Sequence, residues 1–403
     1  MTTSKSQPSI LWVQVWVLAG LQAAITLTWL VYNTYLPQLL TQFGFPASLA
    51  VGILVVENAL AVVMEPLMGG LSDQARLKLG SRFPFILAGV ILAATLLIAI
   101  PCIVTFIPPT EVIRGILPLA LVAWALAMTV FRSPAICLLT IYAMPAELPL
   151  AFSFVTLAGG VVAAFRGIAN QFILSLGAIF AFAIASFVLL AAAFALRFVQ
   201  PPAIPTAQQN LETPKIPLKN LGLILVTGFT VGWGSRLLVD ALGKTLKAQL
   251  NTNDITTIMV WFGLALAVAA LPAGFCAVKL GNRRVMLAGV GITVCSMLIM
   301  VYMRAQIPII FFIITGFSLI VNGVIPFALE LMPQRWAGLG IGMYFGGFSL
   351  AMSLFGVVFP PGMTAVASGF RGAVAFLVAG GCIFLTQSKQ GTGNREQGTG
   401  NRE

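Results

Sequence analysis

Residues 69–84 read GGLSDQARLKLGSRFP, a polar and basic segment between two long apolar runs. Glycines at its start and near its end favour a tight turn. Asp73 can cap the N-terminus of a neighbouring helix or pair with a basic residue there, and either contact would favour one packing of the surrounding helices. Arg76, Lys78 and Arg82 would hold the turn at the headgroups of a membrane. The segment therefore predicts a short loop between two membrane-spanning helices.

The composition of the chain is that of a protein whose main solvent is lipid. Of its 403 residues, 59% are hydrophobic and only 8% are charged, whereas a soluble domain carries about 25% charged residues. The net charge of +11 comes from basic residues in short segments between apolar runs, which is the positive-inside pattern of membrane proteins. The sequence has no basic stripe or aromatic-basic platform, so we expect no nucleic-acid partner.

Twelve segments are apolar over the length of about 20 residues that a membrane-spanning helix needs. The sequence predicts these helices at about 11–37, 48–70, 84–108, 115–138, 150–170, 172–197, 220–242, 255–278, 285–304, 307–330, 337–359 and 368–387. An even number of helices places both termini on the same side of the bilayer.

The basic residues predict that this side is the cytoplasm, with the chain in the inner membrane of the cell. The set predicted to be cytoplasmic is Lys5, Arg76, Lys78, Arg82, Arg132, Arg197, Lys215, Lys219, Lys279, Arg283, Arg284, Arg335, Lys389, Arg395 and Arg402. The smaller external set is Arg114, Lys244, Lys247, Arg304 and Arg371. Cytoplasmic loops are enriched in lysine and arginine, so this imbalance supports the orientation.

The helices divide into two halves. The widest gap between predicted helices, 198–219, is rich in Pro, Gln and Thr and is predicted to be a cytoplasmic linker. It separates an N-terminal half, residues 1–197, from a C-terminal half, residues 220–387. The tail, 388–403, contains the repeat QGTGNRE, and we expect this low-complexity segment to be disordered.

The two halves also share motifs. LGSR at 79–82, followed by AGV at 88–90, is similar to LGNR at 280–283, followed by AGV at 288–290. Each half contains six predicted helices, so the repeat keeps the same topology. Parallel repeats about an axis along the membrane normal are the arrangement of the halves of major facilitator transporters.

The segment at 69–84 resembles the signature loop of the major facilitator superfamily. Its order of Ser-Asp, basic residues, glycine, a basic residue and PFIL is similar to that of the branch containing glycoside–cation symporters and sucrose transporters, and KLGNRR at 279–284 is a weaker copy. The resemblance implies an all-α membrane protein of two pseudo-symmetric six-helix bundles, present as a monomer. It also implies a secondary active transporter that moves a small polar solute, such as a sugar or glycoside, together with a proton or another cation.

The chain departs from this branch after the fourth predicted helix. Symporters of the branch tend to carry an acidic residue and then an arginine across the following loop, but here Glu147 in YAMPAELPL, residues 142–150, has no arginine after it. Two alternatives therefore stay open. One is a proton-linked exporter of amphipathic compounds, and the other is a non-transporting assembly factor of the same fold that handles pigments or membrane complexes.

Ionisable residues within apolar spans are functional candidates because their burial is costly. Glu57 lies near the middle of the second predicted helix, where low polarity favours the neutral acid, so it could bind and release a coupling proton. Arg166 continues a stripe of small and polar residues on the fifth helix and could attract an anionic substrate group, balance Glu57 or extend to the membrane interface. Glu57 could alternatively be a buried structural carboxyl group between helices.

A polar and aromatic face on the first helix predicts a lining for a central cavity. Gln22, Thr26, Trp29 and Asn33 recur at helical spacing on this face, and such a face suits a polyol or glycoside or, equally, hydrogen bonds between helices. We add Trp233 and Asn322, on the seventh and tenth helices, as weaker substrate-binding candidates.

The remaining charged candidates are predicted to couple or gate the two halves. They are Asp73, Arg76, Arg82 and Arg132 near the cytoplasmic side, and Arg236 and Asp240, which are i,i+4 neighbours expected to neutralise each other.

The sequence gives no support for an enzyme. It contains no histidine, and its five cysteines form no metal-ligand spacing, so we expect neither a metal site nor a cofactor. It also lacks the glycine-rich phosphate-binding loop that an ATP-driven pump requires.

Overall fold

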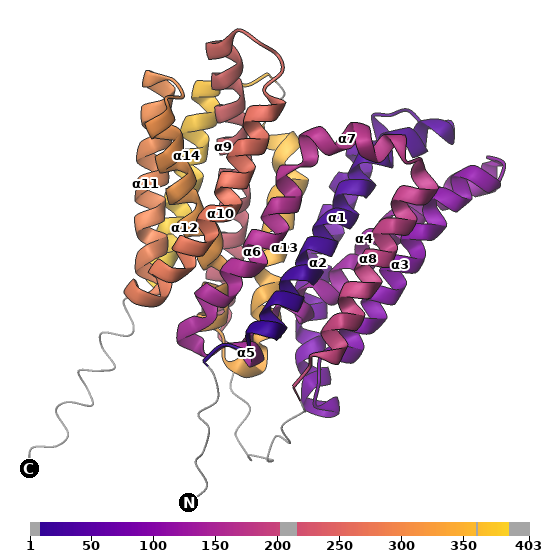
Figure 1. The fold of residues 1–403 in the computed structure, drawn as a ribbon, viewed down its shortest axis with the longest axis horizontal. Coiled ribbons are helices and arrows are strands. Elements are labelled where there is room, and N and C mark those ends of the chain that lie inside the picture. Colours follow the sequence, from indigo (N-terminus) through magenta and orange to yellow (C-terminus); the bar gives the residue numbers. More distant parts are fainter. Residues whose placement is uncertain (1–8, 202–215, 360–361, 387–403) are drawn as a thin grey trace, which may run out of the picture.

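The structure is a computed structural model that describes residues 9–201, 216–359 and 362–386 (Figure 1). Within these residues, twelve helices are long and apolar enough to cross a membrane. They are α1 (Trp12–Gln42), α2 (Leu49–Leu79), α3 (Phe83–Phe106), α4 (Glu111–Ile136), α6 (Leu148–Ala164), α8 (Ala178–Phe198), α9 (Leu218–Leu250), α10 (Thr256–Leu280), α11 (Asn282–Met303), α12 (Ile307–Leu331), α13 (Ala337–Val358) and α14 (Ala365–Leu385). The all-α fold class predicted from the sequence is confirmed.

The helices form two bundles, α1–α8 and α9–α14, and α1 begins on the same side of the molecule as α14 ends (Figure 1). We call this side the terminal side. Two pairs of helices pack along each other between the bundles, α2 with α13 and α6 with α10. Most of the predicted linker, 198–219, and the whole tail, 388–403, lie outside the described residues, as do Lys5, Lys215, Lys389, Arg395 and Arg402.

Four short elements lie between the long helices: α5 (Leu139–Tyr142), η1 (Pro145–Glu147), α7 (Arg166–Ser175) and η2 (Gln334–Trp336). The predicted fifth helix, 150–170, was wrong at its end, because α6 stops at Ala164 and α7 then runs across the direction of the long helices (Figure 1). The predicted start of the sixth helix at 172 was also wrong. Gly177 adopts a positive φ of 77°, and α8 begins at the next residue.

The prediction of a turn at Gly69 and Gly70 was wrong. Helix α2 continues through both glycines to Leu79, and the chain turns at Gly80, whose φ of 71° is in the left-handed region. Gly69 serves packing instead, because a Cβ atom there would overlap the carbonyl oxygen of Gly338 on α13.

Helix α13 presents a row of glycines to α2. Gly338, Gly342 and Gly346 recur every four residues, and a Cβ atom at each would press on α2 atoms between Val62 and Asp73. Small residues at this spacing let two helix backbones approach closely in a membrane. The contact between the bundles on the terminal side is therefore a backbone-to-backbone contact.

We predict that Gly69→Ala destabilises this contact. Overpacking of a tight contact costs typically about 1–3 kcal/mol, so the melting temperature of the purified protein should fall by several degrees. The matched control is Gly70→Ala, whose Cβ would meet the nearest Leu339 carbon at an ordinary 3.8 Å. Equal melting temperatures for the two variants would contradict the close approach of α2 and α13.

Candidate functional site

A cavity of about 1180 Å³ lies between the two bundles. Helices α1, α4, α6 and α7 line it on one side, and α9, α10, α12 and α13 line it on the other. The lining reaches from Ile136 and Ile325 to Asn253, in the loop between α9 and α10 on the side opposite the termini. Most of its surface is apolar. We call this space the central cavity.

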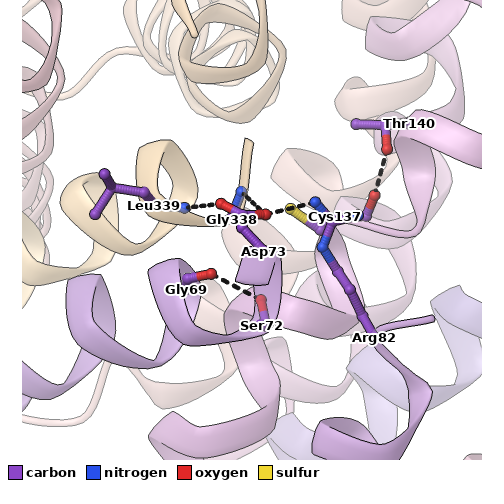
Figure 2. Close-up of polar contacts among 8 residues, drawn as sticks. All are labelled: Gly69, Ser72, Asp73, Arg82, Cys137, Thr140, Gly338 and Leu339. Atoms are coloured by element: carbon purple, nitrogen blue, oxygen red, sulfur yellow. Dashed lines mark hydrogen bonds and ion pairs between the residues drawn. The ribbon is translucent and has the colours of Figure 1, made fainter. Parts of the chain in front are cut away.

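The terminal side is closed by a polar cluster around Asp73, near the end of α2 (Figure 2). The Asp73 carboxylate accepts hydrogen bonds from the backbone N–H groups of Gly338, at 3.0 Å, and Leu339, at 2.9 Å. These N–H groups belong to the first turn of α13, where a helix has no backbone acceptors of its own. A carboxylate at this position is also favoured by the helix dipole. Asp73 thus joins the two bundles.

Asp73 is held in this position by Arg82. Their Oδ1 and Nη2 atoms are 2.5 Å apart, and each side chain is about 1% exposed or less. Arg76 lies close enough to Arg82 for their charges to interact. Cys137, after the last residue of α4, is buried beside the same cluster (Figure 2). Ser72, Asp73 and Arg82 are each at most 1% exposed, so the cluster fills the terminal end of the bundle interface.

A second ion pair lies deeper between the bundles. Arg132 on α4 and Glu65 on α2 are 2.5 Å apart, and Ser133 donates a hydrogen bond to Glu65 at 3.0 Å. The guanidinium group of Arg132 also stacks on the ring of Phe345 on α13, at 4.0 Å from its centroid. The predicted gating residue Arg132 therefore contacts both bundles.

Glu57 is buried on α2, at 3% exposure, and accepts a hydrogen bond from the hydroxyl group of Tyr32 on α1. It lies outside the lining of the central cavity. It lines a separate pocket of about 50 Å³ together with Trp29, Asn58, Glu65 and residues of α4 and α13. No contact joins Glu57 to Arg166 in the part of the chain that the structure describes.

The predicted pair of Arg236 and Asp240 is wrong. Asp240 instead binds Lys244, with 2.6 Å between the charged atoms, and accepts a hydrogen bond from Ser368 at 2.6 Å. Arg236 stacks on the ring of Phe355, at 4.7 Å from its centroid. An acidic residue pairs better with a basic residue four positions later than with one four positions earlier, which favours Lys244.

Of the predicted substrate-binding residues, Gln22, Thr26 and Arg166 line the central cavity. The other four lie outside that lining. Trp29 lines the small pocket beside Glu57. The remaining three donate hydrogen bonds to backbone carbonyl groups: Asn33 to Trp29 at 2.7 Å, Trp233 to Ala351 at 2.7 Å and Asn322 to Pro149 at 3.1 Å.

Two basic residues of the cavity lining were not expected from the sequence. Lys244 and Lys247 were assigned to an external loop because the seventh helix was predicted to end at 242, but α9 continues to Leu250. The signal is present in the sequence as leucines at 242, 246 and 250, which repeat at helical spacing beyond the predicted end.

The described residues contain no group of three or more His, Cys, Asp or Glu side chains placed to hold a metal ion. No protein-family model and no curated protein sequence matches the chain.

Solved structures of similar fold cover nearly the whole chain. The human organic anion transporter MFSD10 is 14% identical, with a TM-score of 0.68 over 94% of this chain and 100% of that one. A bacterial homologue of the iron transporter ferroportin, in an outward-facing state with soaked iron, is 16% identical, with a TM-score of 0.69 over 93% and 99%. The Major Facilitator Superfamily transporter FucP, in the outward conformation, is 13% identical, with a TM-score of 0.67 over 92% and 97%.

The three similar structures are those of two transporters and a transporter homologue, and they cover 92–94% of this chain. The chain has the fold of the major facilitator superfamily, with twelve apolar helices of membrane-spanning length among its described residues.

We predict that Asp73→Ala opens the terminal side. The variant loses charge-assisted hydrogen bonds worth about 1.5–3 kcal/mol each, enough to raise the open population about tenfold or more. Cys137 supplies the measurement, because its buried thiol should react with a soluble maleimide only when the cluster opens. The rate is measured with the four other cysteines replaced by serine.

The control for this experiment is Asp254→Ala, which removes an exposed carboxylate from the loop on the opposite side. It should leave the labelling rate of Cys137 unchanged. A melting curve for Asp73→Ala separates opening from unfolding. An unchanged labelling rate in a folded Asp73→Ala protein would show that Asp73 does not hold the bundles together.

Proposed function

We propose that this chain is a secondary active transporter that moves a small organic solute across the inner membrane of the cell by alternating access. The observation that carries the proposal is the central cavity between two bundles, together with its closure on the terminal side by the Asp73 contacts with Gly338 and Leu339. Sites at the interface of two repeats, exposed alternately by rocking of the repeats, are the working principle of such transporters.

The contacts that close the terminal side suit a reversible motion. Asp73 joins α2 to α13 through two hydrogen bonds from backbone N–H groups, and Arg82 of its own bundle holds the carboxylate in place through an ion pair. Water can replace all of these partners when the bundles separate, so the open arrangement differs from the closed one by only a few kcal/mol. When two states are this close in free energy, binding of a solute can shift the equilibrium between them.

The proposed orientation places both termini in the cytoplasm. The terminal ends of the described helices carry basic residues such as Arg76, Arg132, Arg197 and Lys279, as expected for cytoplasmic loops. In this orientation the central cavity reaches toward the external side, so the structure corresponds to an outward-facing state.

We further propose that Glu57 couples transport to protons. Its carboxyl group is buried against a neutral partner, the hydroxyl group of Tyr32, and has no counter-ion among the described residues. Burial without a counter-ion disfavours the charged carboxylate, so uptake of a proton stabilises this group. The charge state of Glu57 then affects the packing of α2. The same helix carries Asp73, so a change in the charge of Glu57 can alter the closed terminal side through α2, without involving the residues of the central cavity.

The solute class follows from the cavity walls more than from the fold. The three similar structures are named for an organic anion transporter, an iron transporter homologue and a transporter that another structure names a fucose:proton symporter. A fold alone therefore does not select the solute. The mostly apolar lining favours an amphipathic solute over a sugar or glycoside, and Trp29 lies outside the lining.

We predict that the distance between the bundles has two populations on each side of the molecule, and that the distances on the two sides change in opposite directions. Spin labels at the exposed residues Leu79 and Leu280 report the terminal side, and labels at Val112 and Leu250 report the opposite side. In liposomes, the terminal distance should lengthen in the same population in which the opposite distance shortens. A single distance on each side under all conditions of pH and added solute would contradict alternating access.

We predict that Glu57→Gln removes the pH dependence of this equilibrium. In the wild-type protein, the ratio of the two distance populations should change between mildly acidic and mildly alkaline pH. In the variant it should stay constant, because the amide cannot titrate. Glu111→Gln, at an exposed position in the first turn of α4, is the matched control and should titrate like the wild type. The coupling role fails if Glu57→Gln titrates normally.

A further inference from the structure

The charged side chains of the central cavity are mostly basic. Arg166, Lys244 and Lys247 line it, whereas Asp240 is the only acidic side chain among the described residues of the lining. The Asp240 carboxylate is already occupied by Lys244 and by the hydroxyl group of Ser368, each at 2.6 Å. Lys247 lies close enough to Asp254 for their charges to interact, so Arg166 is the basic side chain of the lining that has no carboxylate beside it among the described residues.

Arg166 stands at the point where α6 ends and α7 begins. It makes no hydrogen bond or ion pair with any residue that the structure describes, in contrast to Arg82 and Arg132, which each bind a carboxylate. The positive charge of Arg236 acts on it from the other bundle and adds to the local field. A guanidinium group in this setting offers its full set of N–H donors to a solute.

Apolar walls extend from Arg166 toward the closed terminal side. Phe152 and Val155 on α6, Phe262 on α10 and Phe348 on α13 all line this cavity. Twelve positions separate Phe152 from Ala164, the last residue of α6 before Arg166, which corresponds to about 18 Å at the rise of an α-helix. The cavity therefore has a basic end beside α7 and a deep apolar part beyond it.

We propose that the central cavity binds an amphipathic organic anion, with its carboxylate or sulfonate group on Arg166 and its apolar body along α6, α10 and α13. The inference rests on the proposed transport function and names the solute class of the same site. A carboxylate matches the planar guanidinium group in two parallel hydrogen bonds. A neutral sugar would leave that charge unpaired, and an organic cation would be repelled by the basic lining.

The anionic headgroup of a membrane lipid presents the same chemistry as a soluble organic anion. The two sources differ in how they reach the cavity, since a lipid enters from the bilayer and a solute from water. The experiment therefore compares nanodiscs of phosphatidylcholine alone with nanodiscs that also contain phosphatidylglycerol.

The test uses three naphthalene probes that differ mainly in charge: 2-naphthoate, the neutral 2-naphthamide and 2-naphthylmethylammonium. Binding to the full-length protein is measured by titration in phosphatidylcholine nanodiscs, and flux is measured separately in liposomes. The anion should bind roughly 10- to 100-fold more tightly than the amide, the ratio expected for charge-assisted hydrogen bonds. The cation should bind more weakly than the amide.

The variant Arg166→Gln should weaken binding of 2-naphthoate to the level of the amide, while leaving the amide itself unchanged. Arg371→Gln is the matched control, because Arg371 is an exposed arginine on α14 outside the cavity lining. A melting curve shows that each variant is folded. Equal affinities for anion and amide, or an Arg166→Gln protein that keeps the preference for the anion, would overturn the proposal.

Two further outcomes separate this inference from the proposed function. If the anion binds through Arg166 but no probe crosses the liposome membrane, the solute class stands and the transport function fails. If a neutral or cationic probe is transported while the anion is neither bound nor carried, the function stands and the solute class fails. Loss of 2-naphthoate binding in phosphatidylglycerol nanodiscs would assign the site to a lipid headgroup and overturn the proposal of a soluble anion.

Discussion

The first turn of every helix leaves backbone N–H groups without partners, and in a membrane protein these groups cannot all turn to water. Here two of them, at Gly338 and Leu339 of α13, are satisfied by Asp73 of the other bundle. The rest of the arrangement depends on this contact. It draws α2 and α13 together until only glycine fits between their backbones, and it leaves the remaining space between the bundles on the opposite side.

The sequence predicts the number and order of the long helices because a bilayer imposes length and apolarity on each of them. It predicts local breaks less well. Glycines at 69 and 70 look like a turn in sequence but lie within α2, since a glycine that permits a turn also permits a close helix contact. The break between α6 and α7 falls at Phe165, whose side chain is 39% exposed, and no glycine or proline occupies residues 164–166 to mark it in the sequence.

The candidate site was only partly predictable for a related reason. Helical spacing identifies which residues share a face, as for Gln22 and Thr26, but not which helix that face will meet. Trp233 and Asn322 have the composition of a binding face, yet each donates its hydrogen bond to the backbone of a neighbouring helix. Arg166 was a candidate because an arginine in an apolar segment is costly to bury unless it reaches water, the membrane interface or an opposite charge.

Helix α2 carries three buried carboxyl groups, and their partners differ in kind. Arg82 supplies a permanent positive charge to Asp73, and Arg132 supplies one to Glu65. Glu57 faces only the hydroxyl group of Tyr32. A fixed counter-ion stabilises the ionised form, whereas a hydroxyl partner can serve either form by donating or accepting a hydrogen bond.

Glu57 is therefore the carboxyl group of α2 whose charge can change at the smallest cost in lost contacts. Helix α2, which closes the terminal side through Asp73, also carries Glu57, farther from the terminal side than Asp73. The small pocket that Glu57 lines includes Ser349 of α13, so Glu57 lies next to the interface between α2 and α13. The proposed solute site at Arg166 and the proposed proton site at Glu57 thus lie at separate places along the same pair of bundles.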